Sequence, residues 1–516
     1  MSAITQLICN KFGGIRERNA CFSSDVITAQ DLQNIELYYT GINGGIGIRT
    51  VKGNISENSE LSGQANIIKI FSSTQKTENY FFVYAENGTK GTLYLKKSET
   101  NTLQIIKDDL QKTGEANGFD VSQGWSDLFF FTNGKDMLTA EMNVLAEDQI
   151  TTTNKIKVLD LKDIEGRSVT GIIAAVWNNR LWISNGNILW YSVLADIYDF
   201  ATHESGIVTS AGYIELLKNI TAIHEYLGAL AVFFADSSLL VSVSNGDFSV
   251  GDESPGGCAG FNSLVFHDTN LFFYDDTKKS VFSFQQIING EKTLGENVAV
   301  EIQSILNTIN SSKLNEIQTY SLFMEGRNEI WWILPSDTNY STIMIYDYLK
   351  GEWIKRKSQK INSVCLVDGE LYSAGNDGSI LKEYNSDSFN GEYIQHYYNC
   401  SPCNLGSDNT LKILVFPPRV SFDMPYNNQF YVKYVKNYNI FKSPKIRFIK
   451  SKLKNYLYWG IGFWGKNFWA NKHTSAISKF PSATFKTLEI SLFTSNASQS
   501  FSIKNIEFSK IKVKQV

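Results

Sequence analysis

The chain has 516 residues, of which 43% are hydrophobic, 13% aromatic and only 19% charged. This composition excludes an intrinsically disordered chain, which would be poor in aromatic residues and rich in charge. The formal net charge of −4 is small for this length, so it neither requires nor excludes a nucleic-acid partner. The low charge also suggests that much of the surface is covered by other molecules, as in an assembly.

Neither export nor membrane insertion is indicated. The first residues, MSAITQLICNK, contain no basic segment followed by an apolar run, so we expect no secretory signal. The longest nearly apolar run, Leu227 to Ala235, is about half as long as a membrane-spanning helix. The 6 cysteines are scattered along the chain and do not suggest a disulfide scaffold. We therefore expect a soluble protein that is made in the cytoplasm and has no membrane anchor.

Most of the chain reads as short β-strands, with helices expected only at residues 29–35 and 103–112. Residues 79–95 contain two strands around Asn87-Gly88, a strong hairpin signal. Residues 174–192 predict three strands joined by tight turns. The fold class is therefore all-β.

The strand groups repeat with a period of about 40 residues, which is typical of propeller blades. Seven units can be aligned, at residues 66–108, 124–162, 169–200, 219–248, 260–286, 317–357 and 361–385. Because the closing blade is commonly assembled from both ends of such a domain, seven units predict a β-propeller of six or seven blades. One or two irregular β-sandwiches are the alternative. We expect an N-terminal segment (1–65) that packs on or closes the propeller (66–385), followed by a C-terminal β-rich docking domain (386–516).

The C-terminal part carries a concentrated positive charge. Residues 424–488 contain 12 basic residues and no acidic residue, leaving 36 basic against 52 acidic residues, or −16, in the rest of the chain. Lysines and aromatic residues in this pattern could bind nucleic acid. Alternating apolar positions, such as Phe430, Val432 and Tyr434, equally suit half-buried strands, and we favour docking onto an acidic protein surface.

Catalytic and cofactor motifs are absent from the sequence. The 5 histidines lie far apart, and no HExxH, GxSxG or Walker motif occurs. His396, Cys400 and Cys403 could provide three zinc ligands, but a single CxxC pair without a fourth ligand is weak support, and we expect free thiols. We therefore predict no enzyme activity, no cofactor and no metal.

The N-terminal segment resembles the opening of tail nozzle, or stabilisation, proteins of short-tailed bacteriophages. The resemblance rests on the order of three short blocks, Phe12-Gly13-Gly14-Ile15-Arg16, Asp31-Leu32-Gln33-Asn34-Ile35-Glu36 and Gly45-Ile46-Gly47-Ile48-Arg49. Later apolar blocks and the glycine spacing of Trp459-Gly460-Ile461-Gly462-Phe463-Trp464-Gly465 are also similar. Outside this last block, the C-terminal domain matches only loosely.

The resemblance implies a structural virion protein located in the tail. Such proteins form a propeller-bearing ring, commonly of six copies, below the portal and adaptor proteins. The ring extends the DNA channel, helps to retain the genome and carries fibres, spikes or a needle. On this basis the candidate assembly residues are Gly13, Gly14, Arg16, Asp31, Asn34, Arg49, Trp459, Trp464 and Trp469.

A channel wall should present neutral or acidic groups to passing DNA, so we expect the basic stretch to face other proteins. The alternative function is a propeller lectin or carbohydrate-active protein that recognises a host surface glycan.

Overall fold

The computed structural model consists almost entirely of β-strands, and the predicted all-β class is confirmed. Its 516 residues divide into two compact units, which we describe separately: unit 1 contains residues 1–55, 342–358 and 384–516, and unit 2 contains residues 56–341 and 359–383. The structure describes residues 4–16, 26–41, 44–58, 61, 63–75, 78–96, 102–124, 126–142, 156–204, 208–244, 247–284, 295–324, 326–402, 411–415, 418–424, 428–437, 445–450, 456–457, 468–469, 474–477, 484–494 and 499–514.

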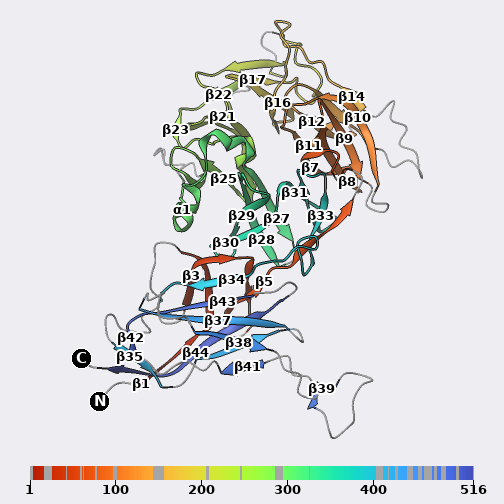
Figure 1. Ribbon diagram of the computed structural model, residues 1–516. Helices are drawn as coiled ribbons and strands as arrows, with labels where there is room; N and C mark the ends of the chain where they lie inside the picture. Colours follow the sequence, from red (N-terminus) through yellow and green to blue (C-terminus); the bar gives the residue numbers. More distant parts are fainter. Residues whose placement is uncertain are drawn as a thin grey trace. The chain divides into compact units, whose positions relative to one another are not determined.

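Seven small sheets follow one another along the chain (Figure 1); most of their residues belong to unit 2, and residues 342–358 of the sixth sheet belong to unit 1. The first three sheets are β7 (Asn66–Gln75), β8 (Glu78–Asn87), β9 (Lys90–Lys96) and β10 (Leu103–Gln111); β11 (Asn117–Gln123), β12 (Ser126–Thr132), β13 (Met137–Ala140) and β14 (Ile156–Val158); and β15 (Ile173–Trp177), β16 (Arg180–Asn185), β17 (Ile188–Tyr191) and β18 (Gly212–Glu215). The fourth and fifth are β19 (Ala222–Tyr226), β20 (Ala229–Phe233), β21 (Ser237–Ser244), β22 (Asp247–Val250) and β23 (Ser254–Pro255); and β24 (Leu264–His267), β25 (Asn270–Asp275) and β26 (Ser280–Ser283). The sixth and seventh are β27 (Gln318–Met324), β28 (Arg327–Leu334), β29 (Tyr340–Asp347) and β30 (Glu352–Gln359); and β31 (Ile361–Val367), β32 (Glu370–Gly375) and β33 (Ile380–Ser386), joined by β6 (Gly53–Asn58).

The seven sheets form a closed β-propeller. The first strand of each sheet contacts the first strand of the next sheet from β7 to β19 and from β24 to β31, and β31 returns to contact β7. Between the fourth and fifth sheets, the rings of His224 and Phe266 stack with their centroids 5.4 Å apart. The predicted propeller is thus confirmed with seven blades. Strand β6, from the N-terminal side of the propeller, completes the seventh blade.

The second strand of each blade explains the aromatic runs in the sequence. In β12, Phe129 and Phe131 pack toward the first blade, whereas Phe130 packs toward the third. Trp182 and its neighbours Leu181 and Ile183 divide in the same way between two inter-blade cores. Because successive side chains of a strand point to opposite faces, a strand covered on both faces reads as a continuous apolar run.

Short helical segments connect some of these strands. They are η2 (Phe261–Ser263), η3 (Val300–Ile302), α1 (Gln303–Leu306) and η4 (Ser311–Glu316). No helix in the described ranges is long and apolar enough to cross a membrane.

Unit 1 is built around a 14-stranded sheet to which both ends of the chain contribute. Its N-terminal strands are β1 (Ile4–Cys9), β2 (Lys11–Ile15), β3 (Val26–Gln33), β4 (Ile35–Tyr39) and β5 (Ile46–Thr50). Its later strands are β34 (Tyr397–Cys400), β35 (Leu411–Leu414), β36 (Arg419–Asp423), β37 (Gln429–Lys436), β38 (Lys445–Lys450), β41 (Thr474–Ile477), β42 (Thr484–Phe485), β43 (Leu488–Phe493) and β44 (Ser502–Lys514). Strands β39 (Tyr456–Leu457) and β40 (Phe468–Trp469) form a separate parallel pair.

This sheet places segments from opposite ends of the chain side by side. Strand β1 pairs with β44 in antiparallel orientation, and β3 pairs with β34. In β37, Phe430, Val432 and Tyr434 are buried and alternate with half-buried Tyr431 and Lys433, as the sequence pattern predicted. The segments 1–65 and 386–516 were expected to be separate parts, whereas in the structure residues 1–55 and 384–516 belong to the same unit.

Both predicted helices are wrong. Residues 26–33 form β3, which lies between β2 and β34 in the sheet, and residues 103–111 form β10, the outer strand of the first blade. These segments are too short to be stable as isolated helices, and pairing with neighbouring strands satisfies their backbone groups instead.

Candidate functional site

A polar cavity of about 260 Å³ lies where the first strands of several blades begin. It is lined by Asn66 of β7, Glu115 just before β11, Asn262 of η2, Gln318 of β27 and Asn362 of β31, among other residues. Blades repeated around an axis bring the corresponding ends of their first strands together around a central channel. The propeller fold therefore gathers side chains that are hundreds of residues apart in the sequence.

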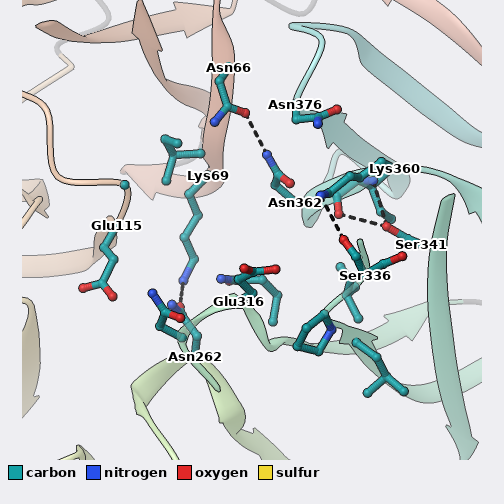
Figure 2. A pocket seen from close by; sticks show the side chains of 18 of the residues that line it. Asn66, Lys69, Glu115, Asn262, Glu316, Ser336, Ser341, Lys360, Asn362 and Asn376 are labelled. Atoms are coloured by element: carbon teal, nitrogen blue, oxygen red, sulfur yellow. Dashed lines mark hydrogen bonds between the residues drawn. The ribbon is translucent and has the colours of Figure 1, made fainter. Parts of the chain in front are cut away.

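Hydrogen bonds hold part of this lining in place (Figure 2). The side-chain amide of Asn362 donates to the Asn66 Oδ1 atom at 3.0 Å and to the Ile67 carbonyl oxygen at 2.7 Å. The ammonium of Lys360 donates to the Ser336 carbonyl oxygen at 3.1 Å. These contacts fix the wall that the sixth and seventh blades contribute.

Lys69 extends into the cavity from β7 (Figure 2), and its ammonium donates to the Asn262 Oδ1 atom. The nitrogen also lies 5.2 Å from the ring centroid of Phe261. Burial lowers the pKa of Lys69 to about 8, and the nearby carboxylate of Glu115 partly opposes this shift. Lys69 also lines two further cavities, of about 190 and 380 Å³, so this residue borders three cavities of the propeller.

The cavity is polar and has balanced charge. Lys69 and Lys360 provide two ammonium groups, and Glu115 and Glu316 provide two carboxylates. Asparagine, glutamine and serine side chains supply both donors and acceptors. Among the described residues, no group of three histidine, cysteine or acidic side chains is arranged to hold a metal ion. The arrangement suits hydrogen bonding to a small polar molecule.

The first candidate assembly residues contact strand β30 of the same chain, within unit 1. The Gly14 amide donates to the Glu352 Oε2 atom at 2.9 Å, and the Arg16 guanidinium pairs with the Glu352 Oε1 atom at 2.8 Å. A Cβ atom on Gly14 would lie 2.2 Å from the carbonyl oxygen of Trp353, whereas one on Gly13 would lie 3.2 Å from the Glu352 side chain. Gly14 thus allows the close approach of two backbones.

Asp31 and Asn34 bind the same strand. Asp31 forms an ion pair with Lys355, and its other oxygen accepts a hydrogen bond of 2.8 Å from the Tyr397 hydroxyl. Asn34 has a positive φ of 55°, and its Oδ1 atom accepts a hydrogen bond of 2.9 Å from the Lys357 amide. Asparagine suits this position because it tolerates left-handed backbone angles and because its side chain can hydrogen-bond to the neighbouring strand.

The remaining candidates are placed as follows. The Arg49 guanidinium pairs with the buried carboxylate of Glu36 on the neighbouring strand. Trp469 lies in β40, where its backbone is in register with Leu457. Trp459 and Trp464 lie outside the described residues. Contacts of all these residues with a second copy stay a prediction.

Of the three residues that were weighed as zinc ligands and expected to bind no metal, His396 and Cys400 are buried, and Cys403 lies outside the described part of the chain. His396 is buried, and its Nε2 atom lies 3.1 Å from the Val51 carbonyl oxygen while its Nδ1 atom lies 3.3 Å from the Thr494 hydroxyl. Burial lowers the pKa of His396 to about 4. The Cys400 thiol is buried with a raised pKa, and Cys403 is outside the described residues. Because both ring nitrogens of His396 are engaged, its role in this structure is that of a hydrogen-bonded core residue.

Comparison with known proteins finds no matching family model and no match among curated proteins.

Sequence reasoning missed the cavity residues. Lys69 and Asn262 are isolated polar residues in two of the aligned repeats, Glu115 lies between two of the repeats, and none of the three belongs to a motif. The available signal was their position at or just before the first strand of a repeat, which becomes informative only when the repeats close into a ring.

Proposed function

We propose that this protein is a structural component of the tail of a short-tailed bacteriophage and forms the nozzle ring below the portal and adaptor. The observation that carries the proposal is the arrangement of the three N-terminal blocks. These blocks lie on β2, on β3 and the start of β4, and on β5, and the strand order in the sheet is β3-β2-β5. Blocks that resemble the nozzle family only through their order in the sequence are therefore neighbours in one folded unit.

The internal cavities of the propeller bear on the position of the DNA channel. They measure about 190–380 Å³, which is too little space for a DNA duplex, whose major groove alone is about 12 Å wide and about 8.5 Å deep. Side chains such as Lys69 and Phe261 also occupy the space near the cavities. In the proposed ring, DNA passes between copies of the protein and not through the propeller of one copy.

The partners follow from the proposed role. The protein binds other copies of itself, in a ring that is commonly a hexamer in the family it resembles, together with portal and adaptor proteins on one side and fibres, spikes or a needle on the other. The basic stretch 424–488 then faces these proteins, and DNA passes without sequence-specific contacts. No catalysis takes part.

Electron microscopy of the full chain, alone and mixed with candidate portal and adaptor proteins, tests this proposal. We expect rings, formed either by the chain alone or on the portal and adaptor scaffold, and no hydrolysis of host glycans. A chain that stays monomeric on that scaffold contradicts the proposal. A ring map with residues 424–488 lining the lumen contradicts the proposed orientation.

A further inference from the structure

We propose that the 260 Å³ cavity of the propeller is a binding site for a small neutral saccharide, at the scale of one or two sugar rings. This inference is independent of the proposed nozzle function, because its residues belong to unit 2 and the blocks of the nozzle resemblance belong to unit 1.

The first argument is the number of hydrogen-bonding groups that converge on the cavity without an assigned partner. Within the described residues, the side chains of half-buried Glu115 and Gln318 and of exposed Asn376 form no hydrogen bond, and the Glu115 carboxylate acts on the Lys69 ammonium only through its charge. In Figure 2, Glu115, Glu316 and Asn376 surround the Lys69 and Asn362 side chains from different elements. Groups from several blades around one space suit a ligand that offers many hydrogen bonds in different directions.

The second argument is charge. Among the lining residues, the two ammonium groups of Lys69 and Lys360 equal the two carboxylates of Glu115 and Glu316 in number, so the lining has no formal excess of either sign; the Glu316 carboxylate also lies 3.9 Å from the ammonium of Lys313, outside the lining. An anion or a cation would gain little from such a site. A hydroxyl both donates and accepts, so a polyhydroxylated ligand can use the ammonium groups, the carboxylates and the amides together.

The third argument is size and the apolar part of the wall. The cavity lies just below the range of about 300–1,000 Å³ that is typical of drug-sized ligands, which favours a smaller molecule. Ile68, Ile333, Leu334 and Pro335 supply apolar surface beside the polar groups. A sugar ring presents C–H faces as well as hydroxyls, and this mixed lining can contact both.

The test is a titration of the folded full-length chain with glucose, galactose, mannose, N-acetylglucosamine and lactose, followed by calorimetry and ligand-observed NMR. Glycine and inorganic phosphate serve as zwitterionic and anionic probes. We expect at least one saccharide to bind and neither probe to compete with it. Glu115→Gln keeps the shape of the side chain but removes a charged acceptor, so it should weaken binding roughly tenfold.

Glu204→Gln is the matched control, because Glu204 lies on an exposed loop of the same unit and does not line the cavity. It should bind the saccharide as the original chain does, and thermal melting confirms that both variants are folded. The proposal is overturned if no saccharide binds, if glycine or phosphate binds in its place, or if Glu115→Gln binds the saccharide unchanged. A structure of the soaked protein with only water in the cavity also overturns it.

Discussion

Replacing Gly14 with alanine should destabilise unit 1 far more than the same change at Gly13. The Cβ atom at position 14 would meet the backbone of Trp353, with the carbonyl oxygen at 2.2 Å and the amide nitrogen at 2.9 Å. A backbone cannot move aside as a side chain can, so β2 would have to separate from β30. At position 13 the nearest atoms belong to the side chains of Glu352 and Thr28, at 3.2 and 3.3 Å, which can shift slightly.

The expected loss in the free energy of unfolding follows from the contacts that are broken when β2 separates from β30. Overpacking alone costs about 1–3 kcal/mol. Loss of the 2.9 Å hydrogen bond from the Gly14 amide to the Glu352 carboxylate adds about 1.5–3 kcal/mol if it is complete. The Arg16–Glu352 ion pair adds little, because the Arg16 side chain is 37% exposed. Allowing for partial relaxation, we expect about 2–4 kcal/mol for Gly14→Ala and less than about 1 kcal/mol for Gly13→Ala.

Urea unfolding monitored by circular dichroism gives the two stabilities, and hydrogen exchange followed by mass spectrometry locates the change. Gly14→Ala should increase exchange in peptides from residues 11–16 and 352–358, and Gly13→Ala should leave exchange there close to that of the original chain. Equal stabilities for the two variants would refute the reasoning, because both substitutions add the same methyl group and only its surroundings differ.

Three further predictions concern buried ionisable groups. The side chain of Lys96 is only 2% exposed, and its ammonium pairs with the Glu57 carboxylate at 3.0 Å. Because Glu57→Gln leaves the buried ammonium without its counter-charge, it should lower the free energy of unfolding by about 3 kcal/mol, and by more than Lys96→Met does. Urea unfolding measures both values, and the reverse order would contradict this reasoning. Lys69 has a folded pKa of about 8, below its unfolded value of 10.5, so the unfolded chain binds more protons between these pH values. The free energy of unfolding of the original chain should therefore rise by up to about 3 kcal/mol relative to that of Lys69→Met between pH 8 and 10.5. A flat difference between these two proteins over that range would contradict burial of the charged amine. His396 has a folded pKa of about 4, below its ordinary value of 6.5. As the pH falls from 6.5 to 4, the free energy of unfolding of the original chain should therefore decrease by up to about 3 kcal/mol relative to that of His396→Gln. Urea unfolding of the two proteins measures this difference, and a difference that does not change with pH would contradict the prediction.

The sequence by itself determined the all-β class and the seven repeats. Runs such as Phe129-Phe130-Phe131 are short and apolar at every position, as in a strand covered on both faces, and similar runs recur about every 40 residues, so the repeat could be recognised without coordinates. Turn positions were also readable: Asn178 and Asn179 both adopt positive φ, at 52° and 53°, in the tight turn that was expected between two strands. Local periodicity and turn chemistry act within a few residues, and a sequence displays them directly.

Tertiary structure alone decided which distant residues meet. The segment 26–33 became a strand because β2 and β34 pair with its two edges, and β34 lies more than 360 residues away in the sequence. The close approach of Gly14 to Trp353 and the gathering of Lys69, Glu115 and Asn262 around one cavity likewise depend on pairing across the chain. A single sequence contains no local sign of such contacts, because each partner satisfies ordinary strand or turn preferences on its own. The fold class was therefore predictable, whereas the candidate site emerged only when the ring of blades closed.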